Sequence, residues 1–480
     1  MNPSLRRDSL IALTLGTLAL AVRVLFLARS PFDGLYGQDA YAYFDHAQAI
    51  RVALSSGTPL PPFFWPIGYP GILAAFFALF GPSATVGQLA SLLMGAALAP
   101  IAYGLARASA VTWPGALVAG LLMVANGQAI QSSLVLMADI PALFWASLSA
   151  FALLRALRTR RTAAFALAGM LLGIAVVTRW ANLLLIIPFA AAIVRSRSSW
   201  RGAIATAAAF GLVLLPQLLI SANSPYPTFN HAWVQGWSPL NAFARDFVNV
   251  DGTFHYAQVN GLFAAGPATE LFFFAPLAIP LIALGVYALR APSRWLLGGW
   301  AVLGWAFLAG IPYQNIRFGL LLSPPLAVLA GAGFGWLWTR LSRHKPARWA
   351  LIAAVGIGFG WMLTASAPPI EAFIARQQAD RDAVMWAASR IPSNSRVYTS
   401  GLTLALRHTV HSSVHELYGL EPSDLAEEAE TGDYVLVNRW QIENQWAGTP
   451  MQDAIHGLET ARGLTLVARY GNYTLYQVKR

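Results

Sequence analysis

Four charged side chains lie beside apolar segments, where charge is costly, and their types suit group transfer at a membrane surface. Asp39 follows the first apolar run, in GQDAYAYFDHA, and Asp139 begins a later one, in LMADIPALFW. Arg179, in VVTRWANLL, and Arg317, in NIRFGLLLS, border two more. Ionisable groups in or near a bilayer are functional candidates by default. A carboxylate can accept a proton from a nucleophile, and a guanidinium matches phosphate oxygens with paired N–H donors.

Each of the four also has a structural interpretation. Aspartate is a favoured N-cap residue, and both aspartates precede a helical pattern, Asp139 with a proline two residues later. An arginine near the membrane surface can extend its guanidinium to water while its stem stays in an apolar layer. The functional interpretation of Arg179 and Arg317 therefore requires that they share one side of the membrane with Asp39 and Asp139.

Further polar and aromatic side chains on the same expected side are candidate substrate contacts. They are Tyr41, Asp45, His46, Tyr69, His231, His255 and Tyr256. Tyr41 and Asp45 are four residues apart and so share one face of the helix expected after Asp39. His231 and His255 could ligate a metal, but their spacing fits no compact metal motif. A mobile loop that covers a substrate is the favoured interpretation of their segment.

The sequence carries no motif for a firmly bound cofactor. Cysteine is absent, which excludes disulfides, thiolate metal sites and thiol nucleophiles. Nothing matches a Walker loop or a dinucleotide fingerprint. His408, His411 and His415 are close in sequence, and a solvated loop or strand face is their favoured interpretation. No cofactor is expected with certainty, and a divalent metal stays open.

Composition predicts a polytopic membrane protein. Of the 480 residues, 56% are hydrophobic and only 11% are charged, whereas soluble proteins average about 25% charged. The net charge of +11 comes from arginines in short loops between apolar runs, as the positive-inside rule predicts. Nucleic-acid binding is therefore not expected. The run over residues 10–28 is long and lacks a clear cleavage site, so we expect a retained first helix.

About eleven apolar segments are candidates for membrane spans. They are residues 9–29, 85–107, 113–128, 139–157, 163–178, 181–194, 202–221, 268–290, 295–311, 318–339 and 348–365. The basic clusters between them fall on one side only if residues 68–80 do not cross. That short stretch is therefore expected to form an interfacial or re-entrant helix on the outer side. The N-terminus is then cytoplasmic, and the loops over residues 30–68 and 222–267 face outward.

A change in composition predicts a small α/β domain, also outside the cytoplasm, at the C-terminus. Helical stretches over residues 371–391, 421–430 and 449–461 alternate with the strand-like runs RVYTS, DYVLVN, LTLVARY and YTLYQV. The last two runs predict a hairpin around Gly471 and Asn472. The predicted domains are thus a membrane module of residues 1–365 and a soluble domain of residues 366–480.

In order and spacing, these motifs resemble the GT-C glycosyltransferases, in particular the branch of protein O-mannosyltransferases and lipid A aminoarabinose transferases. The matching segments are GQDAYAYFDHAQAI, WPIGYPGILAAFFALFG, MADIPALFW, VVTRWANLLLIIP and NIRFGLLLSPPLAVLAG, which together cover roughly residues 5–365. The family often has Asp-Glu where this chain has Asp39-Ala40, and Pro and Lys where it has Trp65-Pro66. Arginines rather than a lysine would therefore contact the donor phosphate.

The resemblance implies an all-α GT-C-like membrane module of a plasma-membrane enzyme. It would move a sugar from a polyprenyl-phosphate donor to an extracytoplasmic lipid, glycan or protein acceptor, with inversion. Asp39 and Asp139 would be catalytic, and Arg179 and Arg317 would bind the donor phosphate. A transporter or flippase of a lipid-linked sugar is an alternative, disfavoured because no internal repeat is visible. A non-catalytic scaffold with a partner-binding C-terminal domain is the other alternative and would tolerate Asp39→Asn.

Overall fold

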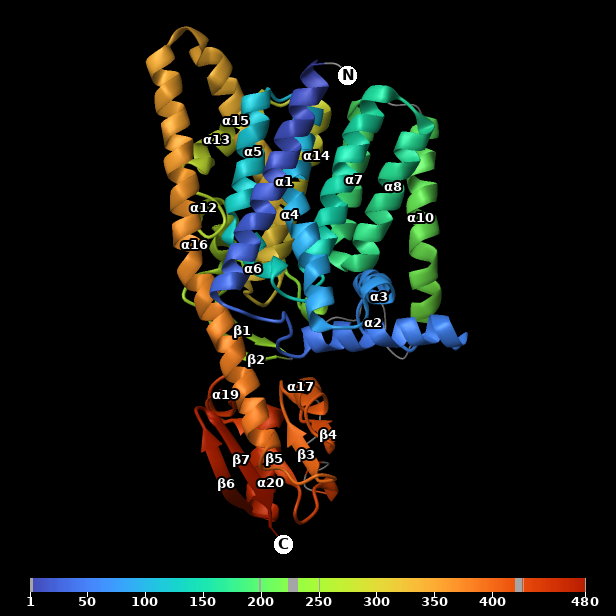
Figure 1. Ribbon diagram of the computed structural model, residues 1–480, viewed down its shortest axis with the longest axis vertical. Coiled ribbons are helices and arrows are strands. Elements are labelled where there is room, and N and C mark those ends of the chain that lie inside the picture. The colour runs from blue at the N-terminus through green and yellow to red at the C-terminus, as the bar shows by residue number, and fades with distance from the viewer. Residues whose placement is uncertain are drawn as a thin grey trace.

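A computed structural model describes residues 3–197, 200–222, 232–249, 251–418, 425 and 427–479. Long helices stand side by side in one layered bundle, and a small sheet domain follows at one end (Figure 1). The helices of the bundle are α1 (Pro3–Arg29), α4 (Ala84–Ala108), α5 (Trp113–Ala125), α7 (Asp139–Thr159), α8 (Thr162–Thr178), α9 (Ile186–Arg195), α10 (Trp200–Ala222), α13 (Ala278–Ala288), α14 (Ala291–Gly310), α15 (Ser323–Arg340) and α16 (Lys345–Ala388). The N-terminus and the sheet domain lie at opposite ends of the bundle.

Glycines let the central helices approach closely. A side chain on Gly115 of α5 would place its Cβ 2.3 Å from the carbonyl oxygen of Gly331 on α15. On the other face of α15, a Cβ on Gly333 would lie 2.0 Å from the carbonyl oxygen of Leu281 on α13. Membrane helices often pack through small residues. Lipid provides no hydrophobic driving force for their association, so close van der Waals contact has to stabilise it. These contacts hold α5, α15 and α13 as one core.

The chain is a multi-pass membrane protein. Among the described residues, six helices are long and apolar enough to cross a membrane, or up to seven if the bent pair of α5 and α6 (Gly127–Ser133) is one span. The shorter apolar helices are Gly68–Phe80, Thr162–Thr178, Trp180–Arg195 and Ala278–Ala288. Most segments expected from the sequence are thus helices, but fewer than eleven reach full spanning length by themselves.

Two expected spans are broken, which corrects the sequence prediction. The segment over residues 113–128 bends by 54° where α5 gives way to α6, and Asn126 caps α6 by accepting a hydrogen bond from the amide of Ala129 at 2.8 Å. The segment over residues 268–290 is not one helix either. It follows α12 (Asn260–Thr269), turns, and becomes helical again only in α13. Pro276 lies in that turn, and proline removes a helical N–H and disfavours helix in the residue before it.

Two helices lie at the sheet-domain end of the bundle, as the sequence predicted. Helix α2 (Asp39–Ser56) runs across the bundle axis, and α3 (Gly68–Phe80) lies beside it (Figure 1). They pack together through a buried cluster that includes Tyr43, Phe44 and Phe77. The short α3 thus lies at one end of the bundle, and its placement as an interfacial or re-entrant helix stays a prediction.

The C-terminal domain is built on a five-stranded mixed sheet in the order β4-β3-β5-β7-β6. Its strands are β3 (Arg396–Thr399), β4 (Ser413–Glu416), β5 (Tyr434–Asn438), β6 (Leu464–Tyr470) and β7 (Tyr473–Val478). The last two form the expected antiparallel hairpin. Strand β4 was not predicted, and it pairs with β3 in parallel. The helical prediction over residues 421–430 lies largely outside the described residues, whereas α20 (Pro450–Ala461) matches the stretch at 449–461.

Helix α16 joins the bundle to the C-terminal domain without interruption. It runs from Lys345 to Ala388 and contains Pro368 and Pro369. The sequence instead predicted two helices with a domain boundary near residue 366. The prolines do not end the helix, so the domain boundary expected near residue 366 falls inside one continuous helix.

The segment over residues 222–267, which the structure describes from residue 232 on except for residue 250, contains a hairpin that the sequence did not predict. Strands β1 (Asp246–Asn249) and β2 (Gly252–His255) pair antiparallel. Gly252 has φ +116°, a conformation that favours glycine, and it allows the tight reversal between the strands. The hairpin lies between the bundle and the C-terminal domain (Figure 1).

Candidate active site

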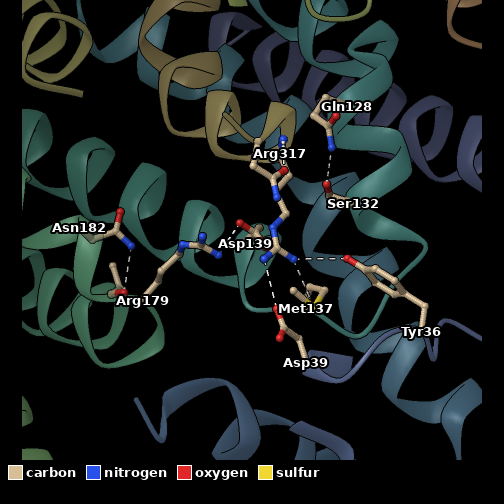
Figure 2. Close-up of polar contacts among 11 residues, drawn as sticks. Tyr36, Asp39, Gln128, Ser132, Met137, Asp139, Arg179, Asn182 and Arg317 are labelled. Atoms are coloured by element: carbon tan, nitrogen blue, oxygen red, sulfur yellow. Dashed lines mark hydrogen bonds and ion pairs between the residues drawn. The ribbon is translucent and has the colours of Figure 1, made fainter. Parts of the chain in front are cut away.

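Arg317 is the centre of a polar cluster at the sheet-domain end of the bundle. Its Nη2 donates to Oδ2 of Asp39 at 3.2 Å, and its Nη1 donates to the hydroxyl of Tyr36 at 3.4 Å (Figure 2). The same Nη1 lies 4.0 Å from the sulfur of Met137. Residues from the start of α2 and the loop before it, from the segment before α7 and from the turn that precedes α15 therefore meet at one guanidinium.

Asp139 and Arg179 form a second ion pair beside the first. Nη1 of Arg179 contacts Oδ1 of Asp139, whose side chain is only 5% exposed. The ring of Phe318 links the two pairs: its centroid lies 5.2 Å from the Arg179 guanidinium carbon and 5.5 Å from that of Arg317. A cation over an aromatic face is attracted by the negative charge of that face. Phe318 thus helps to hold two like charges close together.

The cluster contains two buried polar atoms without a hydrogen-bond partner. They are Nε of Arg317, a donor, and Oδ2 of Asp139, an acceptor. Such groups are costly in a folded protein unless something binds them. The two arginines and two aspartates carry no net formal charge between them. The site therefore offers N–H donors for an anion and carboxylate oxygens for a proton or a hydroxyl.

The four side chains are placed by the ends and breaks of helices. Asp39 is the first residue of α2, and Asp139 is the first residue of α7. Arg179 lies between α8 and the 3-10 helix η1 (Trp180–Leu185), with φ −156° and ψ 120°. Arg317 lies in the 3-10 helix η3 (Ile316–Leu322), where Asn315 accepts a hydrogen bond from the Arg317 amide.

The capping interpretation of the two aspartates is not what the structure shows. The N-cap positions belong to Gln38 and Ala138, and the carboxylates of Asp39 and Asp139 instead contact Arg317 and Arg179. The two arginines do not merely extend to water either, because both guanidiniums pair with carboxylates. The structure thus brings together all four residues that the sequence placed at one membrane surface.

Two of the candidate substrate contacts are packed in an aromatic cluster next to the four. The hydroxyl of Tyr69 is 3.0 Å from Oγ of Ser91, and its side chain is fully buried. The ring of His46 stacks on Phe63 at 4.0 Å, and burial lowers the pKa of His46 to about 4. These neutral, enclosed rings support α2 and α3 rather than face a substrate directly.

Tyr41 and Asp45 face the C-terminal domain instead of the cluster. Oδ1 of Asp45 is 2.7 Å from Nε2 of His408, and the rings of Tyr41 and His408 are 5.2 Å apart. The hydrogen bond from Asp45 raises the pKa of His408 above its ordinary value. These two residues thus form a docking contact between α2 and the domain, and their contact with a substrate stays a prediction.

Two of the candidates from the segment over residues 222–267 lie at the end of β2, where His255 is the last residue and Tyr256 follows it. His255 is exposed and lies 3.0 Å from Asp246 on the paired strand. Tyr256 stacks on Phe254, its hydroxyl is buried, and burial raises its pKa to about 12. His231 lies outside the described residues. Among the described residues, no group of three or more His, Cys, Asp or Glu side chains is arranged to hold a metal ion.

Sequence reasoning missed Tyr36, Met137 and Tyr43. Tyr36 and Met137 contact Arg317, and Tyr43 is buried within electrostatic reach of all four charged residues. Tyr36 lies three residues before Asp39, and Tyr43 lies one helical turn after it, so helical spacing on α2 was a usable signal for Tyr43. Nothing in the sequence distinguishes Met137 from other apolar residues.

A small, largely apolar pocket with a cavity volume of about 20 Å³ adjoins the cluster through Phe318. Its lining also includes Phe263, Tyr313, Asn315 and the half-buried carboxylate Glu270. It combines aromatic faces with a few polar groups, as small-molecule sites do.

Comparison with known proteins agrees with this geometry. Residues 65–223 match the family model of dolichyl-phosphate-mannose-protein mannosyltransferases. The structure is similar to that of ArnT from Cupriavidus metallidurans bound to undecaprenyl phosphate, with a TM-score of 0.66, 14% identity and 97% of each chain covered. It is also similar to the archaeal oligosaccharyltransferase AglB from Archaeoglobus fulgidus, with a TM-score of 0.63, 13% identity, and 100% of this chain and 75% of AglB covered. No curated protein sequence is significantly similar.

The chain therefore has the GT-C glycosyltransferase fold, a helical membrane module with a C-terminal sheet domain. The resemblance that the motifs indicated is confirmed. The family model covers a third of the chain, and that third includes Asp139 and Arg179 but not Asp39 or Arg317.

Proposed function

We propose that the protein is a membrane glycosyltransferase that takes a sugar from a polyprenyl-phosphate donor and transfers it to a hydroxyl or amine outside the cytoplasm. The observation that carries the proposal is the meeting of Arg179 and Arg317 with Asp39 and Asp139 at one end of the bundle. Two guanidiniums can neutralise a phosphate that becomes a leaving group. A neighbouring carboxylate can receive the proton of the acceptor.

The reaction would be a single displacement with inversion. The acceptor oxygen or nitrogen attacks the anomeric carbon, and the bond from that carbon to the phosphate oxygen breaks with its electron pair. Polyprenyl phosphate leaves as an anion held by Arg179 and Arg317. The acceptor proton passes to Asp39, whose carboxylate is the more exposed of the two, with a side chain 35% accessible against 5% for Asp139.

The contact between Arg317 and Asp39 suggests an order of events. While Arg317 donates to Asp39, one oxygen of the carboxylate is occupied by the guanidinium. A donor phosphate competes for the same N–H groups. Donor binding would therefore release Asp39 for the acceptor and favour proton transfer only when a sugar is present.

The fold relatives support this choice of donor. The ArnT structure contains undecaprenyl phosphate, and the AglB structure contains a dolichol-phosphate and an inhibitory peptide. A lipid-linked donor also explains why the sequence needs no nucleotide-binding loop. The ring of Phe318, which contacts both guanidiniums, also lines a small apolar pocket beside the cluster.

Turnover by purified protein tests the proposal. The protein in lipid nanodiscs is incubated with a panel of polyprenyl-phosphate pentoses and hexoses and a mixed envelope extract as acceptor, and released polyprenyl phosphate is measured. We expect catalytic release with at least one donor. Asp39→Asn should reduce that rate by about 10²-fold or more. Asp453→Asn, at an exposed carboxylate on α20, is the control and should behave as wild type.

The same experiment separates the alternatives. A flippase would move a fluorescent lipid-linked sugar across a vesicle membrane without breaking the phosphate bond. A scaffold would show neither activity and would be indifferent to Asp39→Asn. Flipping without release, or no release from any donor, would reject the glycosyltransferase proposal.

A further inference from the structure

The C-terminal domain touches the chain immediately before Asp39. The side chain of Gln38, the N-cap residue of α2, accepts a hydrogen bond from the Leu404 amide at 3.0 Å and donates to Oε2 of Glu416. Oε2 of Glu416 also accepts from the hydroxyl of Thr403 at 2.6 Å. One amide side chain is thus held at both its donor and its acceptor by the domain. The residue next to it is the candidate base.

The extension of α16 toward the domain holds the same loop from the other side. Arg381 forms an ion pair with Asp33 at 2.6 Å, and Gln378 donates to the carbonyl of Pro31 at 2.8 Å. The ring of Phe373 packs edge-on against Tyr36 at 5.3 Å. Tyr36 in turn receives a hydrogen bond from Arg317. The first outer loop is therefore tied to α16 over most of its length before α2.

A second contact leads from the domain to the loop before Arg317. The carbonyl of Gln445 accepts from the Thr253 amide at 2.8 Å, and the Gln445 side chain donates to the carbonyl of Asp251 at 2.7 Å. Asn249 of the same hairpin donates to the carbonyl of Pro312 at 2.8 Å. The hairpin thus transmits the position of the domain to the segment that begins η3.

We propose that the C-terminal domain positions the reacting groups. Glu416 and Gln38 fix the position of Asp39, and Gln445 and the β1–β2 hairpin fix the position of Arg317. This inference rests on the proposed function, and it assigns a task to a domain that the motifs do not cover. One contact leads from the domain to Asp39 and the other leads to Arg317, and these two residues form one ion pair. The domain therefore fixes the separation of Asp39 from Arg317, and a small misplacement of reacting groups can cost about 10²-fold in rate.

The two contacts should have different kinetic effects. Glu416→Ala frees the start of α2, so Asp39 is misplaced while both arginines still bind the donor phosphate. We expect kcat to fall about 10-fold or more and the donor KM to stay within about 2-fold. Glu416→Gln keeps an oxygen for Gln38 and Thr403 and should recover much of the rate. Glu443→Ala, an exposed carboxylate in the same domain, is the matched control and should behave as wild type.

The hairpin contact is tested at Gly252. A Cβ there would lie 2.3 Å from the carbonyl oxygen of Gln445, and φ is +116°. Gly252→Ala should therefore push the hairpin from the domain and raise the donor KM several-fold, because Arg317 binds the phosphate. Gly471→Ala controls for backbone strain, since Gly471 also has positive φ (+54°) but no neighbour within 4 Å of an added Cβ.

A distance measurement provides a readout that does not need activity. The chain has no cysteine, so spin labels can be placed at Ser55→Cys on α2 and Ser393→Cys on the domain, both exposed in the wild type. Glu416→Ala should broaden the distance distribution between the labels, whereas Glu416→Gln and Glu443→Ala should leave it narrow. If Glu416→Ala fails to fold, Gln38→Met breaks the same contact from the membrane side.

The outcomes separate this inference from the proposed function. An inactive wild type with a broadened distribution in Glu416→Ala would reject the glycosyltransferase but not the docking contact. An active wild type whose Glu416→Ala and Gly252→Ala variants keep its kcat, its KM and a narrow distribution would overturn the positioning role. Equal losses in Glu416→Ala and Glu416→Gln would also overturn it, because charge rather than position would then be the cause.

Discussion

At the scale of single residues, the two aspartates have different environments and should have different roles. Asp39 is partly open and shares Arg317 with Tyr36. Asp139 is enclosed, pairs with Arg179 and has one oxygen without a partner. A carboxylate that receives a proton from an acceptor must be reachable, whereas an enclosed carboxylate can fix the orientation of a cation. Asp39 is thus the better base, and Asp139 the better support for Arg179.

Asparagine substitutions should separate these roles by their effect on stability. Asp139→Asn leaves the partly buried Arg179 without its counter-ion, so the free energy of unfolding should fall by about 1–3 kcal/mol. Asp39→Asn changes a more exposed pair and should cost less than about 1 kcal/mol. Thermal unfolding of the two variants in the same detergent is the measurement. Equal loss of stability would contradict the distinction.

At the scale of elements, α3 supports the break that carries Arg179. A Cβ on Gly68, the first residue of α3, would lie 2.4 Å from the carbonyl oxygen of Val177 and 2.7 Å from the amide of Thr178. These backbone atoms immediately precede Arg179. The close approach of α3 to the end of α8 therefore requires glycine and helps to place the guanidinium.

Gly68→Ala should consequently disturb both packing and donor binding. Overpacking of this kind typically costs about 1–3 kcal/mol, and displacement of α8 would move Arg179 away from Asp139. We expect a lower melting temperature and weaker binding of polyprenyl phosphate. Gly71→Ala on the same helix has open space around the added Cβ and should leave both unchanged. A Gly68→Ala protein with wild-type affinity and melting temperature would contradict this account of α3.

Much of this element arrangement could be predicted from the sequence, because it depends on local signals and on parity. The length of the apolar segments predicted the main helices, and the positions of the basic loops predicted that residues 68–80 do not cross. The Gly-Asn turn predicted the β6–β7 hairpin. The parallel pairing of β3 with β4 and the β1–β2 hairpin depend on contacts between distant segments. Pro276 is a local signal for the break between α12 and α13. It was missed because the residues around it are apolar and favoured one continuous span.

The charged residues of the site could be predicted from the sequence, but which of them pair with one another could not. Asp39, Asp139, Arg179 and Arg317 are conspicuous because charge is rare in such a sequence. Their pairing as Arg317 with Asp39 and Arg179 with Asp139 follows from the packing of α2, α7 and η3, which no spacing reveals. For the same reason, Asp45 looked like a substrate contact although it faces His408.

At the scale of the whole molecule, docking of the C-terminal domain should depend on pH through His408. Its pKa is raised by the hydrogen bond to Asp45, so the stabilisation is fully present below about pH 6.5, the ordinary value. It is lost as pH rises through the raised pKa. The pair is partly exposed, and its contribution is at most about 1 kcal/mol.

Limited proteolysis across pH measures this dependence. Between about pH 6 and pH 9, cleavage at the junction of domain and bundle should become faster in the wild type as His408 loses its proton. His408→Gln should remove that pH dependence, whereas His456→Gln, on an exposed face of α20, should retain it. A wild-type junction that becomes more resistant at high pH would contradict the assigned sign.

The orientation of the molecule in the membrane is a separate prediction. The loop between α15 and α16 and the C-terminal domain lie at opposite ends of the bundle (Figure 1). A cysteine at Ser342 in that loop should be protected from an impermeant reagent in intact cells, and a cysteine at Ser393 in the domain should be labelled. The cysteine-free chain makes each label unique. The reverse pattern would place the charged cluster on the cytoplasmic side.

The most direct test of the account is the affinity of the purified protein for polyprenyl phosphate without a sugar. Saturable binding to the wild type is expected, because Arg179 and Arg317 supply paired donors for the phosphate. Arg317→Gln and Arg179→Gln should each weaken it by about 10-fold or more, while Arg390→Gln, at an exposed arginine outside the cluster, should not. Undiminished affinity in both cluster variants would show that the lipid phosphate is held elsewhere, and the proposed site would be wrong.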